Sequence, residues 1–143
     1  MIQLLSGINS TSSALEAERV RMDIVSQNIA NANTTRGVDG KPYQRQEVVF
    51  ETALNQQMGA NGGTIMPGTV RVARIQHDTQ EPRMVYNPTH PDANADGMVG
   101  MPNINIHEEM VDLIASSRSF EANLAVIKNA RSMAVQSLSI GKH

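Results

Sequence analysis

The sequence predicts an α+β fold: long N- and C-terminal helices pair in a coiled-coil-like manner, and a small β-containing region lies between them in the chain. Near the C-terminus, apolar residues recur at alternating spacings of four and three, and a weaker seven-residue repeat runs through the first 34 residues. All six Pro and eight of the ten Gly lie between residues 35 and 105. We therefore divide the chain into an N-terminal helix (1–34), a β- and turn-rich middle region (35–105) and a C-terminal heptad helix (106–143).

The N-terminal helix is predicted by apolar residues that recur every seven positions. These are Ile8, Leu15, Met22 and Ile29. Ser13 and Glu16 have the spacing of a capping box, which favours a helix start near residue 13, because the Ser and Thr residues at 10–13 are poor helix formers. An earlier start, near residue 4, stays open, and the helix is expected to end near residue 32.

The middle region is predicted to contain short strands and turns. β-branched and aromatic residues are enriched at 43–50 and 70–75, as is typical of strands. Residues 82–103 contain four prolines, so this segment is expected to be extended and turn-rich rather than helical. Residues 52–68 are rich in Gln and Gly and match no motif.

The C-terminal helix has the clearest pattern. Its apolar heptad positions include Met110, Leu113, Phe120, Leu124, Ile127 and Leu138. Asn105 is suited to be the N-cap with Glu108 completing a capping box, and Gly141 is the predicted stop. A second apolar line on another face includes Val111, Ile114, Ala122, Ala125 and Met133. A helix with two apolar faces needs more than one neighbour.

The length of this helix argues for an elongated molecule. A helix over residues 106–140 is roughly 50 Å long. A compact globule of this chain length is only roughly 37 Å across. We therefore expect the protein to be elongated and to assemble with neighbours.

Composition excludes several classes of function. Lys and Arg number 12 against 14 Asp and Glu, and this slightly negative balance argues against nucleic-acid binding. No apolar run approaches the length of about 20 residues that a membrane span needs, and the N-terminus lacks the pattern of a cleaved signal peptide. The absence of Cys excludes thiolate metal sites and cysteine nucleophiles. We expect no catalytic residue, no cofactor and no enzymatic activity.

One loop partly matches a calcium-binding sequence. Asp92, Asn94 and Asp96 stand where an EF-hand loop places its first ligands. The twelfth position, a Glu in EF-hands, is Asn103, and the flanks are rich in proline, so we interpret the segment as a polar turn without a metal. The alternative is a helical-hairpin binding module in which residues 82–103 form a calcium-tuned strap.

Residues 28–35 read Asn-Ile-Ala-Asn-Ala-Asn-Thr-Thr, so Asn and Thr replace helix formers where the first helix should end. Residues 24–34, which include most of this segment, resemble the N-terminal signature of bacterial flagellar rod and hook proteins. The heptad helix around 121–133 is similar to the C-terminal helix of the same family. Residues 86–97 and 101–112 narrow the resemblance to the C-type proximal rod subunit of the flagellar basal body. The resemblance covers nearly the whole chain and is weakest at 52–68.

The resemblance implies a structural subunit of the proximal rod, with another axial subunit of the rod and hook family as the alternative. Such subunits are exported by the flagellar secretion apparatus without a cleaved signal peptide. They stack by their terminal helices into a helical tube, the drive shaft in the periplasm. The implied partners are other rod subunits, the ring-to-rod junction protein and the distal rod, with self-association in the assembly, no nucleic acid and no direct membrane span. The resemblance also favours the helix start near residue 4.

We expect assembly to depend on packing residues of both helices. Ile8, Leu15, Met22 and Ile29 are expected to pack within the subunit against Leu113, Phe120, Leu124 and Ile127. The second face, with Ala122, Ala125 and Met133, would then meet neighbouring subunits. The remaining predicted packing residues are Asn28, Asn31, Met110 and Leu138. Which helix face packs within a subunit and which packs between subunits stays open.

Overall fold

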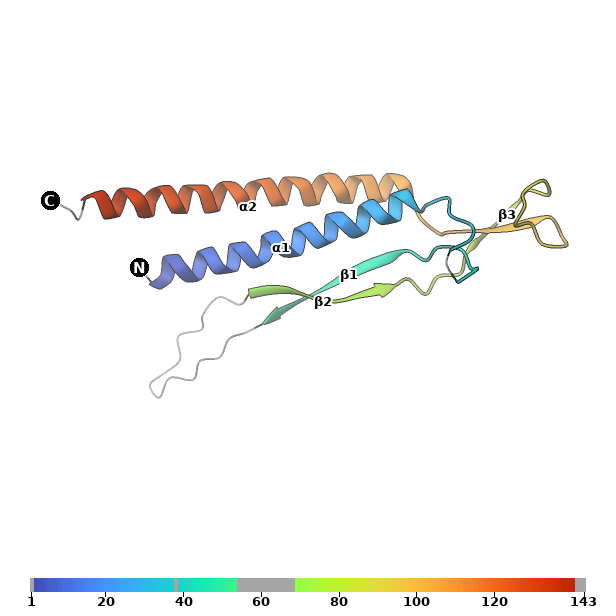
Figure 1. The fold of residues 1–143 in the computed structure, drawn as a ribbon, viewed down its shortest axis with the longest axis horizontal. Helices are drawn as coiled ribbons and strands as arrows, with labels where there is room; N and C mark the ends of the chain where they lie inside the picture. Colours follow the sequence, from blue (N-terminus) through green and yellow to red (C-terminus); the bar gives the residue numbers. More distant parts are fainter. Residues whose placement is uncertain (1, 38, 54–68, 141–143) are drawn as a thin grey trace.

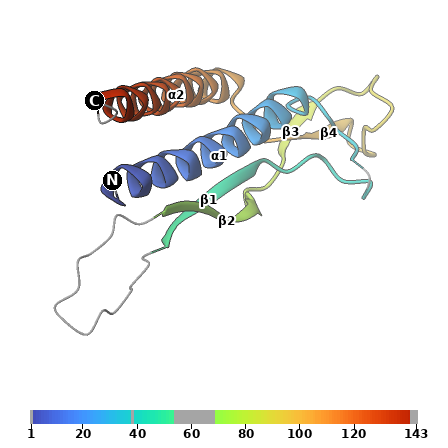
Figure 2. The same ribbon diagram turned by 60° about the vertical axis from the view of Figure 1, so that its left-hand side comes forward.

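The structure, a computed structural model, describes residues 2–37, 39–53 and 69–140. Two long helices and a β-hairpin lie side by side as three layers of an elongated body (Figure 1). The helices are α1 (Ile2–Ala30) and α2 (Ile106–Ile140), and the hairpin consists of β1 (Gln46–Ala53) and β2 (Thr69–His77). α1 is the middle layer, because it contacts both α2 and the hairpin (Figure 2). The α+β prediction is confirmed at this level.

α1 begins at Ile2, so the local prediction of a start near Ser13 is wrong and the earlier start is correct. The Ser13 hydroxyl, which suggested a cap, is bonded within the helix, and so is that of Thr11. Thr11 Oγ1 donates to the carbonyl oxygen of Gly7 (2.8 Å), and Ser13 Oγ donates to that of Ser10 (2.8 Å). Ser and Thr side chains that bond back in this way can sit inside a helix instead of starting one.

β1 and β2 pair in antiparallel fashion, from Gln46 opposite His77 to Ala53 opposite Thr69. The strands overlap the predicted segments 43–50 and 70–75, but β1 is displaced toward the C-terminus. The register shifts between Val49, which lies opposite Arg74, and Phe50, which lies opposite Val72, so Ala73 of β2 is left without a partner in β1. Such a β-bulge increases the local twist. Of the segment 52–68, for which no motif was found, residues 54–68 lie outside the described residues.

The predicted extended segment 82–103 contains a second, smaller hairpin of β3 (Arg83–Tyr86) and β4 (Met98–Met101). The turn between them requires a glycine at its end. Gly97 has φ = +74°, and a Cβ atom there would lie 3.0 Å from Cε2 of Tyr86. Only glycine adopts this conformation without strain and also leaves room for the aromatic ring.

α2 spans 106–140, as the heptad pattern predicts. The predicted N-cap is confirmed, because Asn105 Oδ1 accepts a hydrogen bond from the backbone N–H of His107 (3.1 Å). Glu108 is exposed, and among the described residues it forms no hydrogen bond with Asn105. The predicted stop at Gly141 lies outside the described residues. Neither described helix carries an apolar stretch that could span a membrane.

The buried apolar core of the described residues is thin. Its members are Ala17, Ile24, Val25, Ala32 and Val99. Four of the five belong to α1 or to the turn that follows it, which agrees with the place of α1 between two layers. Polar side chains are therefore prominent in the interior, and two of the three that are fully buried, Asn28 and Glu109, belong to the site described next.

Candidate functional site

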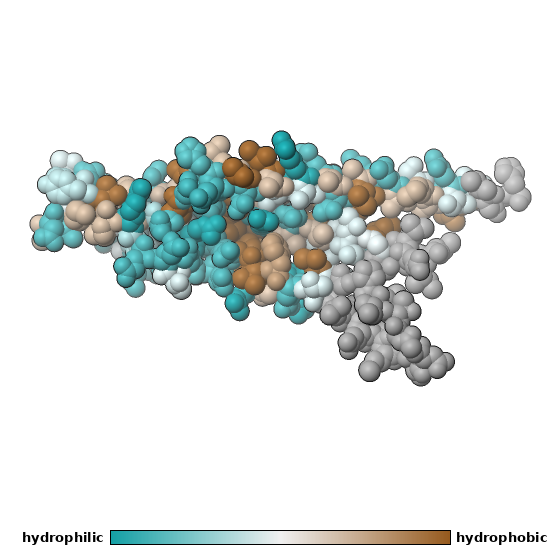
Figure 3. Space-filling view, turned by 180° about the vertical axis from the view of Figure 1, so that it is seen from behind, coloured by the Kyte–Doolittle hydropathy of each residue, from teal (hydrophilic) through white to brown (hydrophobic). Residues whose placement is uncertain are grey.

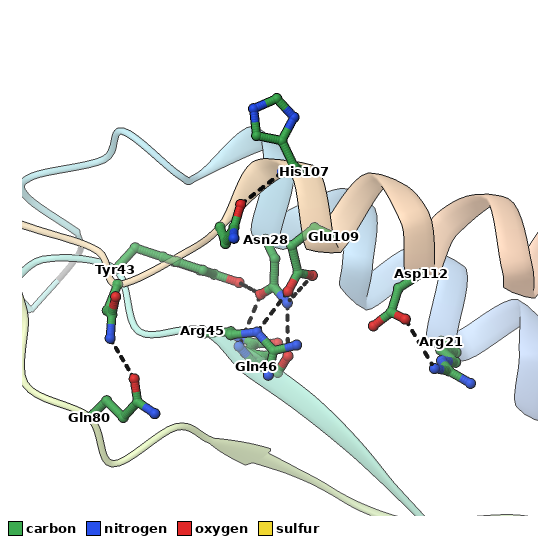
Figure 4. Close-up of polar contacts among 11 residues, drawn as sticks. Arg21, Asn28, Tyr43, Arg45, Gln46, Gln80, His107, Glu109 and Asp112 are labelled. Atoms are coloured by element: carbon green, nitrogen blue, oxygen red, sulfur yellow. Dashed lines mark hydrogen bonds and ion pairs between the residues drawn. The ribbon is translucent and has the colours of Figure 1, made fainter.

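A buried polar cluster joins the three layers at the end of the body where α1 ends and α2 begins (Figure 4). Its five members come from three parts of the chain. Asn28 belongs to α1, Glu109 belongs to the first turn of α2, and Tyr43, Arg45 and Gln46 belong to the segment that enters β1. We call these five residues the polar cluster.

A tight loop after α1 brings the chain back to this position. Tyr43 N–H donates to the carbonyl oxygen of Thr34 (3.1 Å), and Gly37 N–H donates to that of Lys41 (2.7 Å). Gly40, with φ = +73°, allows the turn between them. The chain therefore reverses direction and passes alongside Asn28 as it enters β1.

The side-chain amide of Asn28 uses all of its hydrogen-bonding capacity. Nδ2 donates to the carbonyl oxygen of Gln46 (2.8 Å) and to Glu109 Oε2 (3.0 Å). Oδ1 accepts from Gln46 N–H (2.9 Å) and from the Tyr43 hydroxyl (3.1 Å). Two donors and two acceptor positions are the full inventory of an asparagine amide. Asn28 is 1% exposed, so these bonds replace its hydration completely.

Glu109 is 1% exposed, and each of its carboxylate oxygens meets a donor from a different layer. Oε1 accepts from Arg45 Nε (2.7 Å), and Oε2 accepts from Asn28 Nδ2 (3.0 Å). A buried carboxylate is tolerated when it is paired and hydrogen-bonded in this way. The position near the N-terminus of α2 also favours a negative charge, because of the helix dipole.

The cluster shifts the pKa values of two of its members. Burial raises the pKa of the Tyr43 phenol, and the negative charge of Glu109 raises it further. Burial lowers the pKa of the Arg45 guanidinium, but the hydrogen bond to Glu109 and the carboxylates around it outweigh burial, so the net pKa is raised. Both shifts keep the cluster in the protonation states that its hydrogen bonds require.

The Tyr43 shift predicts a loss of stability in alkaline solution. A group with a raised folded-state pKa contributes stability that is complete below its unfolded pKa, here 10.0, and is lost as the pH rises through the folded value. The free energy of unfolding is therefore expected to fall above pH 10. Urea unfolding at several pH values should show a shallower fall for Tyr43→Phe than for the unchanged chain. Equal slopes for both proteins would contradict the role of Tyr43.

Of the five members of the cluster, the sequence analysis named only Asn28, as a packing residue, and it predicted none of the hydrogen bonds of the cluster. Glu109 and Arg45 are 64 residues apart, and Asn28 and Glu109 are 81 residues apart, so no local pattern connects them. One signal was present. Glu109 lies on the same helical face as Leu113 and Phe120, and a carboxylate on an apolar face indicates a buried partner.

Apart from Asn28, which is fully buried, the predicted packing residues fall into two groups. Those that are half-buried are Ile8, Leu15, Met22, Ile29, Asn31, Leu113, Phe120, Leu124 and Ile127. Met110 and Leu138 are exposed, at 49% and 65%. Asn31 bonds to the end of α1, because its Nδ2 donates to the carbonyl oxygen of Gln27 (2.9 Å). The structure thus places Met110 and Leu138 on the surface of the single chain.

α2 carries most of the exposed apolar surface of the described residues. Of the twelve large hydrophobic side chains that are exposed among those whose burial is described, eight lie on α2, and none lies on residues 7–30 of α1. We call these eight the outer residues of α2: Ile106, Met110, Val111, Ile114, Val126, Met133, Val135 and Leu138. Ala122 and Ala125 of the predicted second face are exposed as well. Figure 3 shows hydrophobic side chains in separate groups along the elongated body.

The loop with the partial EF-hand match uses its side chains for contacts within the protein. Asp92 Oδ2 accepts from Thr35 Oγ1 (2.8 Å), and Asp92 Oδ1 lies 3.7 Å from Arg36 Nη1. Asn94 Oδ1 accepts from the backbone N–H groups of Asp96 and Met98. Among the described residues, no three His, Asp or Glu side chains are grouped as metal ligands would be. These contacts hold the hairpin turn and attach it to the loop after α1.

Replacement of Asp96 is expected to have little effect. Its side chain is exposed, and its contact with Asn94 uses the backbone N–H, which Asp96→Ala retains. The free energy of unfolding should change by less than about 0.5 kcal/mol, as measured by urea unfolding. Asp92→Ala, which removes the contacts with Thr35 and Arg36, is the comparison and should cost more. A larger effect of Asp96→Ala, or an effect that depends on calcium, would contradict this interpretation and indicate that the loop binds an ion.

Comparison with known proteins gives matches at both ends of the chain. A family described as flagella basal body rod protein matches residues 8–36, and one described as flagellar basal body rod FlgEFG protein C-terminal matches residues 95–140. The chain is 43% identical over 146 residues to the flagellar basal-body rod protein FlgC of Bacillus subtilis, covering 94% of this chain and 96% of the relative. It is 40% identical to FlgC of Borreliella burgdorferi, covering 96% and 97%, and 36% identical to FlgC of Escherichia coli O157:H7, covering 97% and 98%.

The two matched regions contain the two central side chains of the polar cluster. Asn28 lies within residues 8–36, and Glu109 lies within residues 95–140. Tyr43, Arg45 and Gln46 lie between the matched regions. The parts of the chain that match family models therefore meet in space at the hydrogen bond between Asn28 and Glu109.

Proposed function

The chain belongs to the flagellar basal-body rod protein family and is a structural rod subunit of the basal body, and from this premise we propose that it forms part of the proximal rod and polymerises there through α1 and α2. The nearly full-length similarity to FlgC proteins supports the choice of the rod position. In this proposal the protein has no catalytic role, and its assembled copies form part of a mechanical element, the drive shaft.

The observation that carries the proposal is the distribution of apolar surface between the helices. α1 is covered on two sides by α2 and by the hairpin, whereas α2 contacts only α1 among the described elements. The outer residues of α2 are therefore without cover in the single chain. Val111 is 66% exposed and Leu138 is 65% exposed, and apolar surface of this kind marks a protein interface. We propose that neighbouring subunits cover the outer residues of α2.

The partners follow from the place in the rod. Members of this family associate with other rod components, and we propose that the neighbours of this chain include the other proximal rod subunits, the ring-to-rod junction protein, the distal rod and further copies of the chain. We also propose that it reaches the periplasm through the flagellar secretion apparatus without cleavage of a signal peptide. Helices that run along an elongated body suit a tube, because each helix can contact neighbours along its whole length.

Electron microscopy of basal bodies purified from a strain that carries this chain tests the proposal. We expect density for the two helices in the wall of the proximal rod, in the part that adjoins the ring-to-rod junction. The outer residues of α2 should contact neighbouring subunits. Density that places the chain in another part of the rod, or that leaves the outer residues of α2 facing solvent, would overturn the proposal.

A further inference from the structure

We propose that Asn28 is a positioning residue: its side-chain amide pairs with the backbone of Gln46 as a neighbouring strand would, and it thereby sets the angle between the β1–β2 hairpin and the helix pair. That the rod uses a fixed angle rests on the proposed function. The angle itself is a property of the single chain, so it can be measured on the isolated protein, without the rod.

The pairing between Asn28 and Gln46 has the pattern of an antiparallel ladder. Gln46 N–H donates to Asn28 Oδ1 (2.9 Å), and Asn28 Nδ2 donates back to the carbonyl oxygen of Gln46 (2.8 Å). Two such bonds to one residue are what a facing strand supplies in a hydrogen-bonded pair. On its other edge β1 is paired with β2, where Gln46 lies opposite His77 and the adjacent Arg45 carbonyl accepts from Asp78 N–H (2.7 Å). The first residue of β1 is thus held between α1 and β2.

The same amide also positions α2. The second Nδ2 proton of Asn28 goes to Glu109, and the Tyr43 hydroxyl holds Oδ1 from the other side. The planar side-chain amide of Asn28 therefore bonds to both the hairpin and α2, and it fixes the orientation of each relative to α1. The chain can rotate the hairpin only by breaking several buried hydrogen bonds together, each of which would leave an unpaired polar atom.

Other contacts of the hairpin are less directional. Val48 and Val49 of β1 are half-buried, and so are Val70 and Val72 of β2. Apolar packing stabilises the contact between layers but does not select one angle, because the hydrophobic effect has no direction. Selection of the angle therefore falls to the polar cluster. Asn28 and Glu109 each bond to both other layers, but Asn28 also pairs with both backbone groups of the first residue of β1.

Only an amide of this length satisfies the geometry. Asn28→Asp would replace a donor with a second negative charge beside Glu109 Oε2 and the carbonyl oxygen of Gln46. Asn28→Leu keeps the volume but removes all four hydrogen bonds. Asn31→Leu is the matched control, since Asn31 is the same residue type one turn later and its amide bonds to Gln27, Thr34 and no other layer.

The test measures the distance between the outer layers in solution. The chain contains no Cys, so two spin labels can be attached at Ala73→Cys in β2 and Arg118→Cys in α2, which are both exposed. Double electron–electron resonance on the full, isolated chain should give one narrow distance distribution. Asn28→Leu is expected at least to double its width or to add a second population. Asn31→Leu should leave it unchanged.

A graded variant keeps the test decisive if Asn28→Leu does not fold. Tyr43→Phe removes one donor to Asn28 Oδ1 and is expected to broaden the distribution by a smaller amount, with nearly the same thermal unfolding midpoint. A residue that only stabilised the fold would lower the midpoint and leave the width unchanged. If Asn28→Leu and Tyr43→Phe both give the width of Asn31→Leu, the positioning role is wrong. That outcome would not contradict the proposed place of the chain in the rod. If the chain proved not to lie in the proximal rod, the distance distribution of the isolated chain would still decide the role of Asn28.

Discussion

Leu124→Asp is expected to block incorporation of the chain into the rod and to make cells non-motile. Leu124 is half-buried on α2, in the heptad line between Phe120 and Ile127. Replacement forfeits roughly 1.5–3 kcal/mol of transfer free energy if the site becomes fully covered in the assembly. A carboxylate enclosed there without a partner adds several kcal/mol or must become protonated. In the single chain the site is half-exposed, so the carboxylate can reach water and the loss is smaller.

The measurement combines swimming motility in a strain complemented with the variant, the amount of variant protein that is exported, and electron microscopy of rods. Export should be largely intact while rods are absent. Ser119→Asp introduces the same charge at an exposed position of the same helix and is the control. Normal rods with Leu124→Asp, or equal damage from both substitutions, would show that the heptad line is assigned to the wrong contact.

Glu109→Ala is expected to cause a large loss of stability. It removes the carboxylate that accepts from Arg45 and from Asn28 and leaves Asn28 Nδ2 with an unused proton in a buried site. Breaking one partner of a buried ion pair costs about 3–5 kcal/mol. The Arg45 side chain is 28% exposed and can turn toward water, so a value near about 3 kcal/mol is expected. Domains are stable by only about 5–15 kcal/mol, so this loss is severe.

Urea unfolding of the purified chain measures the effect of Glu109→Ala, with Glu108→Ala as the control. The two residues are adjacent in the first turn of α2, so both substitutions remove a favourable charge from the helix N-terminus. Only Glu109 is buried. Glu108→Ala is therefore expected to cost less than about 1 kcal/mol. Similar losses from the two substitutions would mean that the polar cluster contributes no more than the helix dipole does.

The parts of the fold that could be predicted are those in which a periodic pattern extends over many residues. The heptad spacing located α2 at both of its described ends, because each turn of a long amphipathic helix repeats the same information. The start of α1 was ambiguous, since Ser13 and Glu16 satisfy the local rule for a cap while the structure bonds Ser13 inside the helix. The four-residue strands β3 and β4 are too short to show a period among the prolines that surround them.

The polar cluster could not be predicted in the same way, because it depends on side chains that meet only after folding. Acidic residues are favourable in the first turn of a helix even when they are exposed. The presence of Glu109 there was therefore explained without a buried partner, and its burial was not predicted. Arg45 fits an alternating strand equally well. Asn28 stood out only as part of the run of Asn and Thr where the first helix should end, and it was predicted as a packing residue, without its hydrogen-bond partners.

The arrangement of α1 between two layers has a consequence for the order in which the chain folds. The residues that separate α1 from α2 number 75, from residue 31 to residue 105, so the pairing of the first element with the last is a contact of high sequence separation. Such contacts form slowly, because a long loop must be closed before any burial compensates for it. The two hairpins can form as soon as their own residues are available. A ribosome or a narrow conduit that releases the N-terminus first therefore holds a chain whose helices cannot pair until its last segment has emerged.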